Sequence, residues 1–281
     1  MTAVTAEHFD FFVGFLRERS AISIGPGKEY LVESRLNPLA RDVGLRDVNE
    51  LIGQLRRPAA DPAVRDRVIE AMTTNETSFF RDSHPFDALR TQVMPEVLRA
   101  NAATRTLRIW SAASSTGQEL YTIAMLLDTH FPQLRDWTVT LHGTDLSTDV
   151  LARARAGRFS ALEINRGLPA TMMVKYFERD GADYVIDQRL RAQCRFEQAN
   201  LAGVWPALPR FDIVFCRNVL IYFDVEIRAR ILSKIRANIG PDGYLFLGST
   251  ESTIGVADGF TRLRVADSVV YRPDTHRSHT A

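Results

Sequence analysis

The sequence predicts an α/β protein that carries an all-helical N-terminal domain and a small antiparallel insertion. Residues 1–92 place apolar side chains at helical spacing and contain no strand pattern. From Thr106 onward, short apolar runs alternate with helical segments, which is typical of a mostly parallel sheet covered on both faces. Residues 158–196 interrupt that alternation with a short helix and a hairpin pattern.

The first expected helix runs from Thr5 to Ser20, and Thr5 is a plausible N-cap. The second contains Pro38, which can kink it, and stops at Gly44. Two more helices are expected at 48–57 and 62–73.

The α/β part is expected to hold strands at 107–110, 138–143, 211–216, 244–248, 261–265 and 268–271. Its helices are expected at 117–130, 147–156 and 224–239, and residues 240–243 read as a turn. In the insertion, a helix at 169–177 precedes a hairpin that joins 184–186 to 194–196. The expected domains are 1–92, 93–272 with 157–197 inserted, and a flexible tail at 273–281.

The composition narrows the class of protein. The 281 residues include 35 Lys and Arg against 34 Asp and Glu, so nothing indicates nucleic acid or a membrane surface as a partner. The N-terminus lacks a secretory signal, and the most apolar run, 219–223, is far shorter than the ~20 residues that cross a bilayer. Cys194 and Cys216 are too few for a disulfide scaffold and lack metal-ligand spacing. We expect a cytoplasmic protein without a metal site.

Three chemically informative segments follow expected strands. Residues 111–119 are small and polar and lead into a helix N-terminus, which suits a ligand, although a tight turn needs the same residues. Asp145 ends the next strand, where an acidic side chain can accept both hydroxyls of a ribose. Its alternative role is an N-cap, for which Ser147 is better placed. Arg217 and Asn218 directly follow a buried strand, so both are expected at the same edge of the sheet.

A further polar and aromatic segment, residues 73–81, joins the two domains. From composition alone it is equally a capped linker anchored by two rings.

These segments together resemble the chemotaxis receptor methyltransferases. The order, spacing and domain plan agree from about residue 5 to 272, and the resemblance is carried by residues 73–81, 110–121, 144–147, 200–201 and 215–223. The resemblance implies a Rossmann-like class I methyltransferase domain that uses S-adenosylmethionine and esterifies glutamates of cytoplasmic chemoreceptor helices. The implied cofactor contacts are Asn75, Thr77, Arg81, Glu119, Asp145, Asn200, Leu201, Arg217 and Asn218.

Two positions depart from the family pattern. Leu120 stands where the family usually has proline. The hairpin around Gly181 is short and has one glycine, which resembles the variant that does not dock on a C-terminal receptor pentapeptide.

Methyl transfer to a glutamate needs no general base, because a carboxyl group of ordinary pKa, about 4.3, is ionised at neutral pH. We expect Arg81 and Tyr222 to orient that carboxylate, although Tyr222 could instead pack under the sheet. Arg35, Arg41 and Arg46 are candidates for docking the acidic receptor helices, the alternative being an ordinary solvated helix face.

Other functions stay open at this stage. They are a methyltransferase of another substrate class, a non-catalytic module that binds the cofactor, and a nicotinamide-dependent oxidoreductase, which the missing glycine fingerprint disfavours. Nothing in the sequence demands more than a monomer.

Overall fold

The computed structural model describes residues 3–205 and 207–274. Two compact units result from the contacts of the chain: Met1–Thr74 with Tyr222–Ile227, and Asn75–Ile221 with Arg228–Ala281. Residues 275–281, most of the expected tail, lie outside the described residues.

The first unit is helical, as the periodicity predicts. Its helices are α1 (Ala6–Ser20), α2 (Glu29–Asp42), α3 (Val48–Leu55) and α4 (Pro62–Met72). The side chain of Thr5 accepts a hydrogen bond from the backbone N–H of His8 and thereby caps α1. Asp47 caps α3 and Asp61 caps α4 in the same way. The apolar faces of the four helices form one core around Phe12, Leu16, Leu36, Leu51 and Val68.

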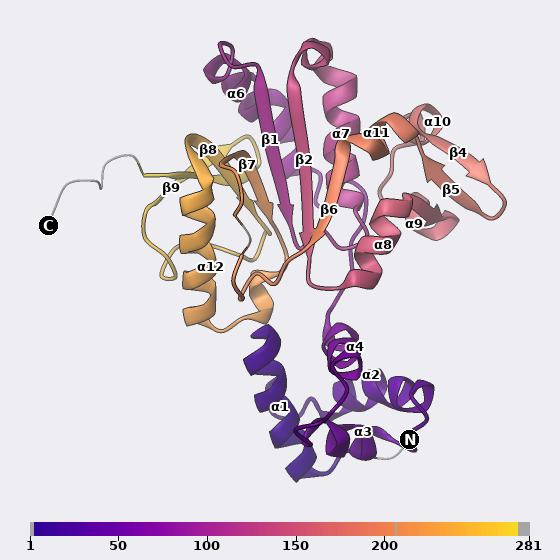
Figure 1. Ribbon diagram of the computed structural model, residues 1–281. Coiled ribbons are helices and arrows are strands. Elements are labelled where there is room, and N and C mark those ends of the chain that lie inside the picture. The colour runs from indigo at the N-terminus through magenta and orange to yellow at the C-terminus, as the bar shows by residue number, and fades with distance from the viewer. Residues whose placement is uncertain (1–2, 206, 275–281) are drawn as a thin grey trace, which may run out of the picture. The chain divides into compact units, whose positions relative to one another are not determined.

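The second unit is built on a mixed seven-stranded sheet of order β6-β2-β1-β7-β8-β10-β9 (Figure 1). The strands are β1 (Thr106–Ala112), β2 (Thr138–Asp145), β6 (Cys194–Gln198), β7 (Phe211–Cys216), β8 (Ile239–Leu247), β9 (Phe260–Val265) and β10 (Ser268–Pro273). The first five in spatial order run parallel, and β10 is antiparallel to both of its neighbours. The carboxyl ends of β1, β2 and β7 therefore meet at one edge, where ligands bind in open α/β sheets.

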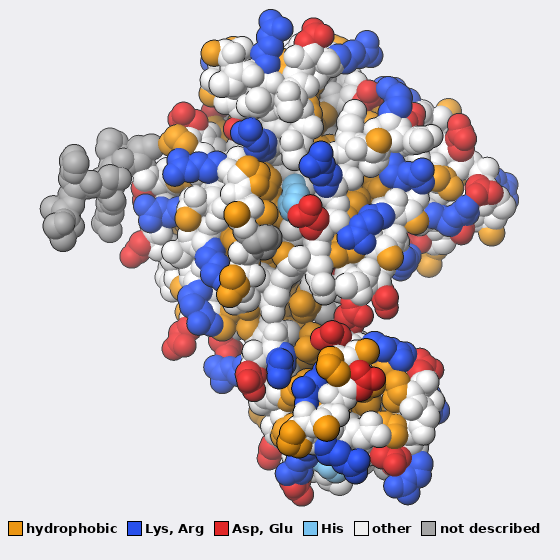
Figure 2. All heavy atoms as spheres, in the orientation of Figure 1, with side chains coloured by type: hydrophobic (Ala, Val, Ile, Leu, Met, Phe, Trp, Pro, Cys, Tyr) orange, Lys and Arg blue, Asp and Glu red, His pale blue; other side chains and the backbone are white. Residues whose placement is uncertain are grey.

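Helices connect and cover these strands. They are α5 (His84–Ala88), α6 (Met94–Ala100), α7 (Gln118–His130), α8 (Thr148–Ala156), α11 (Gln188–Gln193) and α12 (Val225–Asn238). A π-helical turn, Leu89–Val93, joins α5 to α6. Figure 1 shows α12 beside the β7–β8 part of the sheet. No helix among the described residues combines the length and apolarity that a membrane span requires. On the face drawn in Figure 2, acidic and basic side chains are interspersed, in keeping with the near-neutral net charge.

The insertion is smaller than the sequence suggested. It contains a three-stranded antiparallel sheet, β3-β5-β4 (Arg158–Ser160, Asp183–Ile186, Phe177–Asp180), with α9 (Ala161–Asn165) and α10 (Ala170–Tyr176). The expected pairing of 184–186 with 194–196 is wrong, because β5 pairs with β4 and Cys194–Gln198 forms the edge strand β6. The reason lies at Gly143, where a Cβ atom would stand 2.6 Å from the ring of Phe196. The glycine leaves room for this ring beside β2.

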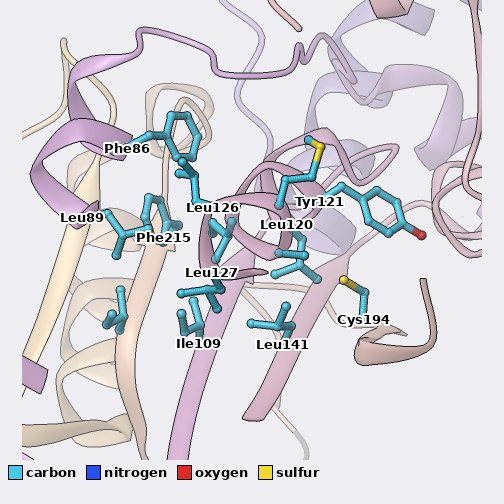
Figure 3. Close-up of a cluster of buried hydrophobic side chains, with 14 of the residues drawn as sticks. Phe86, Leu89, Ile109, Leu120, Tyr121, Leu126, Leu127, Leu141, Cys194 and Phe215 are labelled. Carbon is cyan, nitrogen blue, oxygen red and sulfur yellow. The ribbon is translucent and has the colours of Figure 1, made fainter. Parts of the chain in front are cut away.

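Two other expectations change in detail. Residues 240–243 do not form a free turn but an irregular part of β8, where the register with β7 shifts. The chain also divides after Thr74 rather than near 92. Phe86 and Leu89 pack with Ile109 and Phe215 in the core of the α/β unit (Figure 3). Phe79 belongs to the same core, so the end of the junction segment lies with the α/β unit.

Candidate functional site

Asp145 lies where the turn after β1 meets the end of β2. One carboxylate oxygen accepts a hydrogen bond from the backbone N–H of Ser115 at 2.8 Å, and the other accepts from Ser147 at 3.1 Å. The backbone N–H of Ser114 donates to the carbonyl of Thr144 at 2.8 Å. These bonds join the two strand ends into one rigid rim and fix the direction of the buried Asp145 carboxylate.

The segment before α5 is fastened to this rim. The hydroxyl of Ser115 donates to the backbone carbonyl of Asn75 at 2.8 Å, and the hydroxyl of Thr122 accepts from the backbone N–H of Phe80 at 3.2 Å. Arg81 donates to the carbonyl of Glu76 at 2.9 Å. Asn75 and Arg81 therefore lie on the segment held against the turn after β1.

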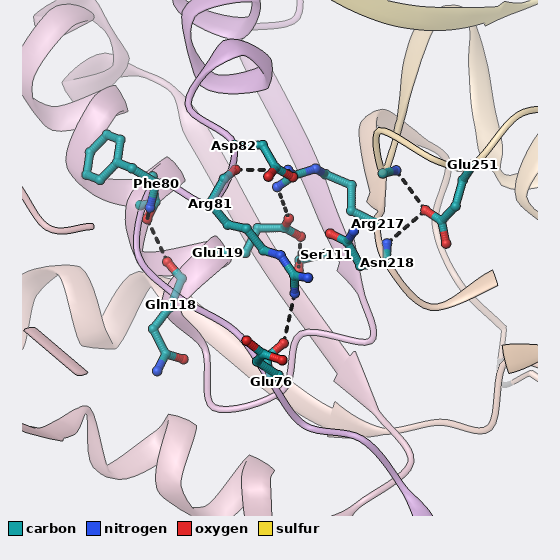
Figure 4. Close-up of polar contacts among 12 residues, drawn as sticks. Glu76, Phe80, Arg81, Asp82, Ser111, Gln118, Glu119, Arg217, Asn218 and Glu251 are labelled. Carbon is teal, nitrogen blue, oxygen red and sulfur yellow. Dashed lines mark hydrogen bonds and ion pairs between the residues drawn. The ribbon is translucent and has the colours of Figure 1, made fainter. Parts of the chain in front are cut away.

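Arg217 is the centre of a buried ionic cluster (Figure 4). Its guanidinium donates to Glu119 at 2.9 Å, to Asp82 at 2.8 Å and to the backbone carbonyl of Arg81 at 2.9 Å. Glu119 also accepts from the hydroxyl of Ser111 at 2.8 Å. Only 2% of the Arg217 side chain is exposed, against 13% for Glu119 and 36% for Asp82. Two carboxylates thus face one guanidinium, which leaves this cluster with a net negative charge.

Backbone strain gathers at the same place. Six non-glycine residues of the site have positive φ angles between 34° and 66°, a region that L-residues seldom adopt: Phe80, Asp82, Ser83, Ala113, Ser115 and Asn218. Such conformations cost free energy and persist only where surrounding contacts impose them. Their concentration around the strand ends supports a functional role for this edge.

Glu251 is a site residue that no sequence pattern predicts. Its carboxylate accepts four backbone N–H bonds: those of Asn218 and Gly248 reach one oxygen at 2.8 and 2.7 Å, and those of Val219 and Leu220 reach the other at 2.9 and 2.7 Å. The available signal is a carboxylate three residues after the glycine that follows an apolar strand, which is too common to single out. Asp82, the other partner of Arg217, also had no distinctive pattern.

The remaining predicted residues lie in separate settings. Thr77 is half-buried, and Asn200 and Leu201 follow β6, with Leu201 buried. Tyr222 ends a 3₁₀ turn, Leu220–Tyr222, and groups by its contacts with the first unit, where its carbonyl accepts from the backbone N–H of Ser23 at 3.1 Å.

The three candidate docking arginines differ from one another. Arg35 donates to the carbonyls of Met72 and Thr73 at 2.6 and 2.9 Å, so it holds the end of α4. Arg46 pairs with Glu50 at 3.1 Å, and Arg41 is exposed.

The cysteines do not provide a nucleophile. Burial raises the pKa of the Cys216 thiol well above its usual value, and the charges of Glu251 and Glu119 raise it further. Burial also raises the pKa of Cys194. Both thiols are therefore protonated at neutral pH. Within residues 3–205 and 207–274, no group of three or more His, Cys, Asp or Glu side chains is arranged to hold a metal ion.

Comparisons with known proteins match both units. A family model described as "CheR methyltransferase, all-alpha domain" matches residues 7–73, and one described as "CheR methyltransferase, SAM binding domain" matches residues 75–268. "Chemotaxis protein methyltransferase 1" of Pseudomonas aeruginosa is 39% identical over 277 residues, which cover 97% of this chain and 99% of that protein. "Chemotaxis protein methyltransferase Cher2" of Pseudomonas putida is 38% identical over 271 residues, which cover 94% of this chain and 97% of that protein. "Chemotaxis protein methyltransferase" of Vibrio parahaemolyticus is 37% identical over 278 residues, which cover 97% of this chain and 99% of that protein.

Proposed function

The chain belongs to the CheR methyltransferase family, and from that membership we propose that it transfers a methyl group from S-adenosylmethionine to glutamate side chains of chemoreceptors. The products are glutamyl methyl esters on the receptors' cytoplasmic helices, and the reaction serves adaptation in chemotaxis. The observation that supports this most is the pair of matches, in order, over residues 7–73 and 75–268.

The described residues fit the cofactor that the family uses. The hydroxyl of Ser114 is buried at the strand ends without a hydrogen-bond partner, so it is free to bind a polar ligand group. Glu119, Asp82 and Asp145 place three carboxylates at this edge, against the guanidinium groups of buried Arg217 and half-buried Arg81. The excess of negative charge suits a ligand that carries positive charge. S-adenosylmethionine, when bound, supplies an electrophilic methyl group on a positively charged sulfur.

The protein's own residues would then bind the cofactor and orient it. Asp145 would accept the ribose hydroxyls, because Ser115 and Ser147 fix its carboxylate at the end of β2, where an acidic side chain can meet a ribose. Asn200 and Leu201 would border the adenine, and Glu119 and Asn218 would lie near the amino-acid end. Thr77 and Asn75 would close the site from the junction segment.

The acceptor needs orientation rather than deprotonation. A glutamate carboxylate is already ionised at neutral pH, so neither histidine nor the protonated thiols are required as a base. Arg81 and Tyr222 would direct its oxygen in line with the methyl carbon. Holding two reactants in line contributes on the order of 7–11 kcal/mol in well-oriented cases.

The acceptor protein would be recognised without a pentapeptide tether. The strands β4 and β5 are joined by only two residues, Gly181 and Ala182, so the insertion offers a short hairpin. We therefore propose that the helical unit, through Arg41 and its neighbours Arg35 and Arg46, meets the acidic receptor helices. The enzyme would act in the cytoplasm as a monomer.

The decisive experiment is incubation of the full chain with methyl-labelled cofactor and receptor-containing membranes, followed by peptide mapping. Base-labile label on receptor glutamates is the expected result. Label on another residue type would indicate a different substrate class. Binding of S-adenosylhomocysteine in calorimetry with no transfer to any receptor would favour a non-catalytic cofactor-binding module.

A further inference from the structure

The carboxylate of Glu251, which lies in the loop after β8, accepts hydrogen bonds from four backbone N–H groups. Its two oxygens accept the N–H groups of three consecutive residues, Asn218, Val219 and Leu220, and that of Gly248. The first three follow β7 and lead into the 3₁₀ turn that ends at Tyr222. The side chain of Glu251 therefore connects the loop after β7 to the end of β8 through hydrogen bonds.

The negative charge of Glu251 is balanced by these dipoles. None of the ion pairs among the described residues involves Glu251. Consecutive backbone N–H groups that converge on one point form a concave anion-binding site, and charge-assisted bonds of this kind are the stronger class of hydrogen bond. Here the anion bound by the protein's backbone is its own side chain.

The arrangement leaves little freedom for alternatives. A Cβ atom at Gly248 would stand 2.7 Å from the Glu251 carboxylate and 2.9 Å from both the backbone and side-chain nitrogens of Asn218. Asn218 itself has a φ of 59°, in the left-handed region, which asparagine adopts more readily than most other residues with a side chain. The carboxylate thus bonds to Asn218 where the chain turns sharply after β7 and restricts the conformations open to this loop.

We propose that Glu251 is a positioning residue for methyl transfer: by holding the backbone of Asn218, Val219 and Leu220, it sets Asn218 toward the cofactor. This rests on the proposed role of Asn218 in cofactor binding. Glu251 acts through the loop and not by contact with the reacting atoms.

The substitution Glu251→Gln tests the carboxylate with almost no change in size. In either orientation of the amide, one end can still accept two N–H bonds, but the other end presents N–H donors to two further donors. Two of the four backbone groups therefore lose their acceptor, either those of Asn218 and Gly248 or those of Val219 and Leu220. In both cases the loop after β7 loses part of the bonding that positions Asn218.

Calorimetry with S-adenosylhomocysteine on the full chain separates positioning from folding. We expect E251Q to raise the Kd at least tenfold with a binding stoichiometry near that of the unchanged protein, and the KM for S-adenosylmethionine to rise with it. A purely structural role would lower the stoichiometry, because fewer molecules are folded, and leave the Kd of the folded ones unchanged. An unchanged Kd overturns the proposal.

Two further variants complete the test. Glu163→Gln is the matched control, since Glu163 also accepts a backbone N–H, that of Ser160 at 2.9 Å, but lies in the insertion, and its Kd should not change. If E251Q does not fold, Gly248→Ala disturbs the same carboxylate from the other side, and an unchanged Kd there overturns the proposal. If the unchanged protein itself does not bind S-adenosylhomocysteine, the proposed function fails, which is a different outcome.

Discussion

Replacing Arg217 by methionine tests the buried ionic cluster. The substitution keeps much of the side-chain volume but removes the guanidinium that donates to Glu119, Asp82 and the carbonyl of Arg81. Removing one partner of a buried pair costs about 3–5 kcal/mol, because the other charge stays buried and unpaired. Glu119, 13% exposed, is such a charge, whereas Asp82 at 36% is partly screened by water, so we expect the lower end, about 3 kcal/mol.

Tryptophan fluorescence during urea unfolding measures the loss in free energy of unfolding for the α/β unit, which contains Arg217. All three tryptophans, Trp110, Trp137 and Trp205, belong to the α/β unit, so the signal does not report the unfolding of the helical unit. For a domain of this size, the expected loss corresponds to a fall in Tm of about 6–12 °C.

Two companion variants decide the interpretation. In the Arg217→Met background, Glu119→Gln should recover more than about 1 kcal/mol, because the amide leaves no unpaired charge at position 119 and its oxygen still accepts from Ser111. Arg153→Met, which breaks an exposed pair with Glu163, should cost less than about 1 kcal/mol. A loss below about 1 kcal/mol in Arg217→Met, or no recovery in the double variant, would refute the reasoning.

Four other predictions each concern a single side chain. Arg81→Ala should cut turnover at least tenfold with an unchanged unfolding curve, and activity like that of the unchanged protein would remove Arg81 from the mechanism. Burial lowers the pKa of His142, and of its two charged neighbours Glu197 raises this pKa while Arg195 lowers it. Because the pKa is lower in the folded state, the unfolded chain binds a proton below about pH 6.5 that the folded state does not favour. Stability should therefore fall as pH decreases from 7.5 to 5, and His142→Phe should show a shallower fall in urea titrations at each pH; equal slopes would contradict this. Arg35→Ala should destabilise the helical unit by about 1–3 kcal/mol, because the carbonyls of Met72 and Thr73 at the end of α4 lose a charged donor. Arg41 is exposed, so Arg41→Ala should lower receptor binding in pull-down assays without changing Tm.

Local patterns predicted most of the elements correctly. The bounds of β7 agree with the expected strand at 211–216, and Thr5 and Ser147 cap the helices as expected. Periodicity and capping depend on residues within one or two turns of each other, so a single stretch of sequence carries the whole signal. The positions of Asp145 and Arg217 at strand ends followed directly from those strands.

The pairing of side chains in the site was not predictable in this way. Arg217 and Asp82 are 135 positions apart, and Asn218 and Glu251 are 33 apart, and neither pair has a spacing that identifies it. The strand β6 pairs with β2 at the edge of the large sheet and not in a hairpin, which its sequence does not reveal because its alternation suits both equally.

The sequence by itself thus determined the two structural classes, the order of strands and helices along the chain, and which polar residues end the strands. Only the tertiary structure decided which of those residues meet, since the spatial order β6-β2-β1-β7-β8 differs from their order along the chain. The physical reason is that a buried carboxylate or guanidinium needs a partner to offset its desolvation, and that partner is supplied by whichever loop the folded sheet places beside it.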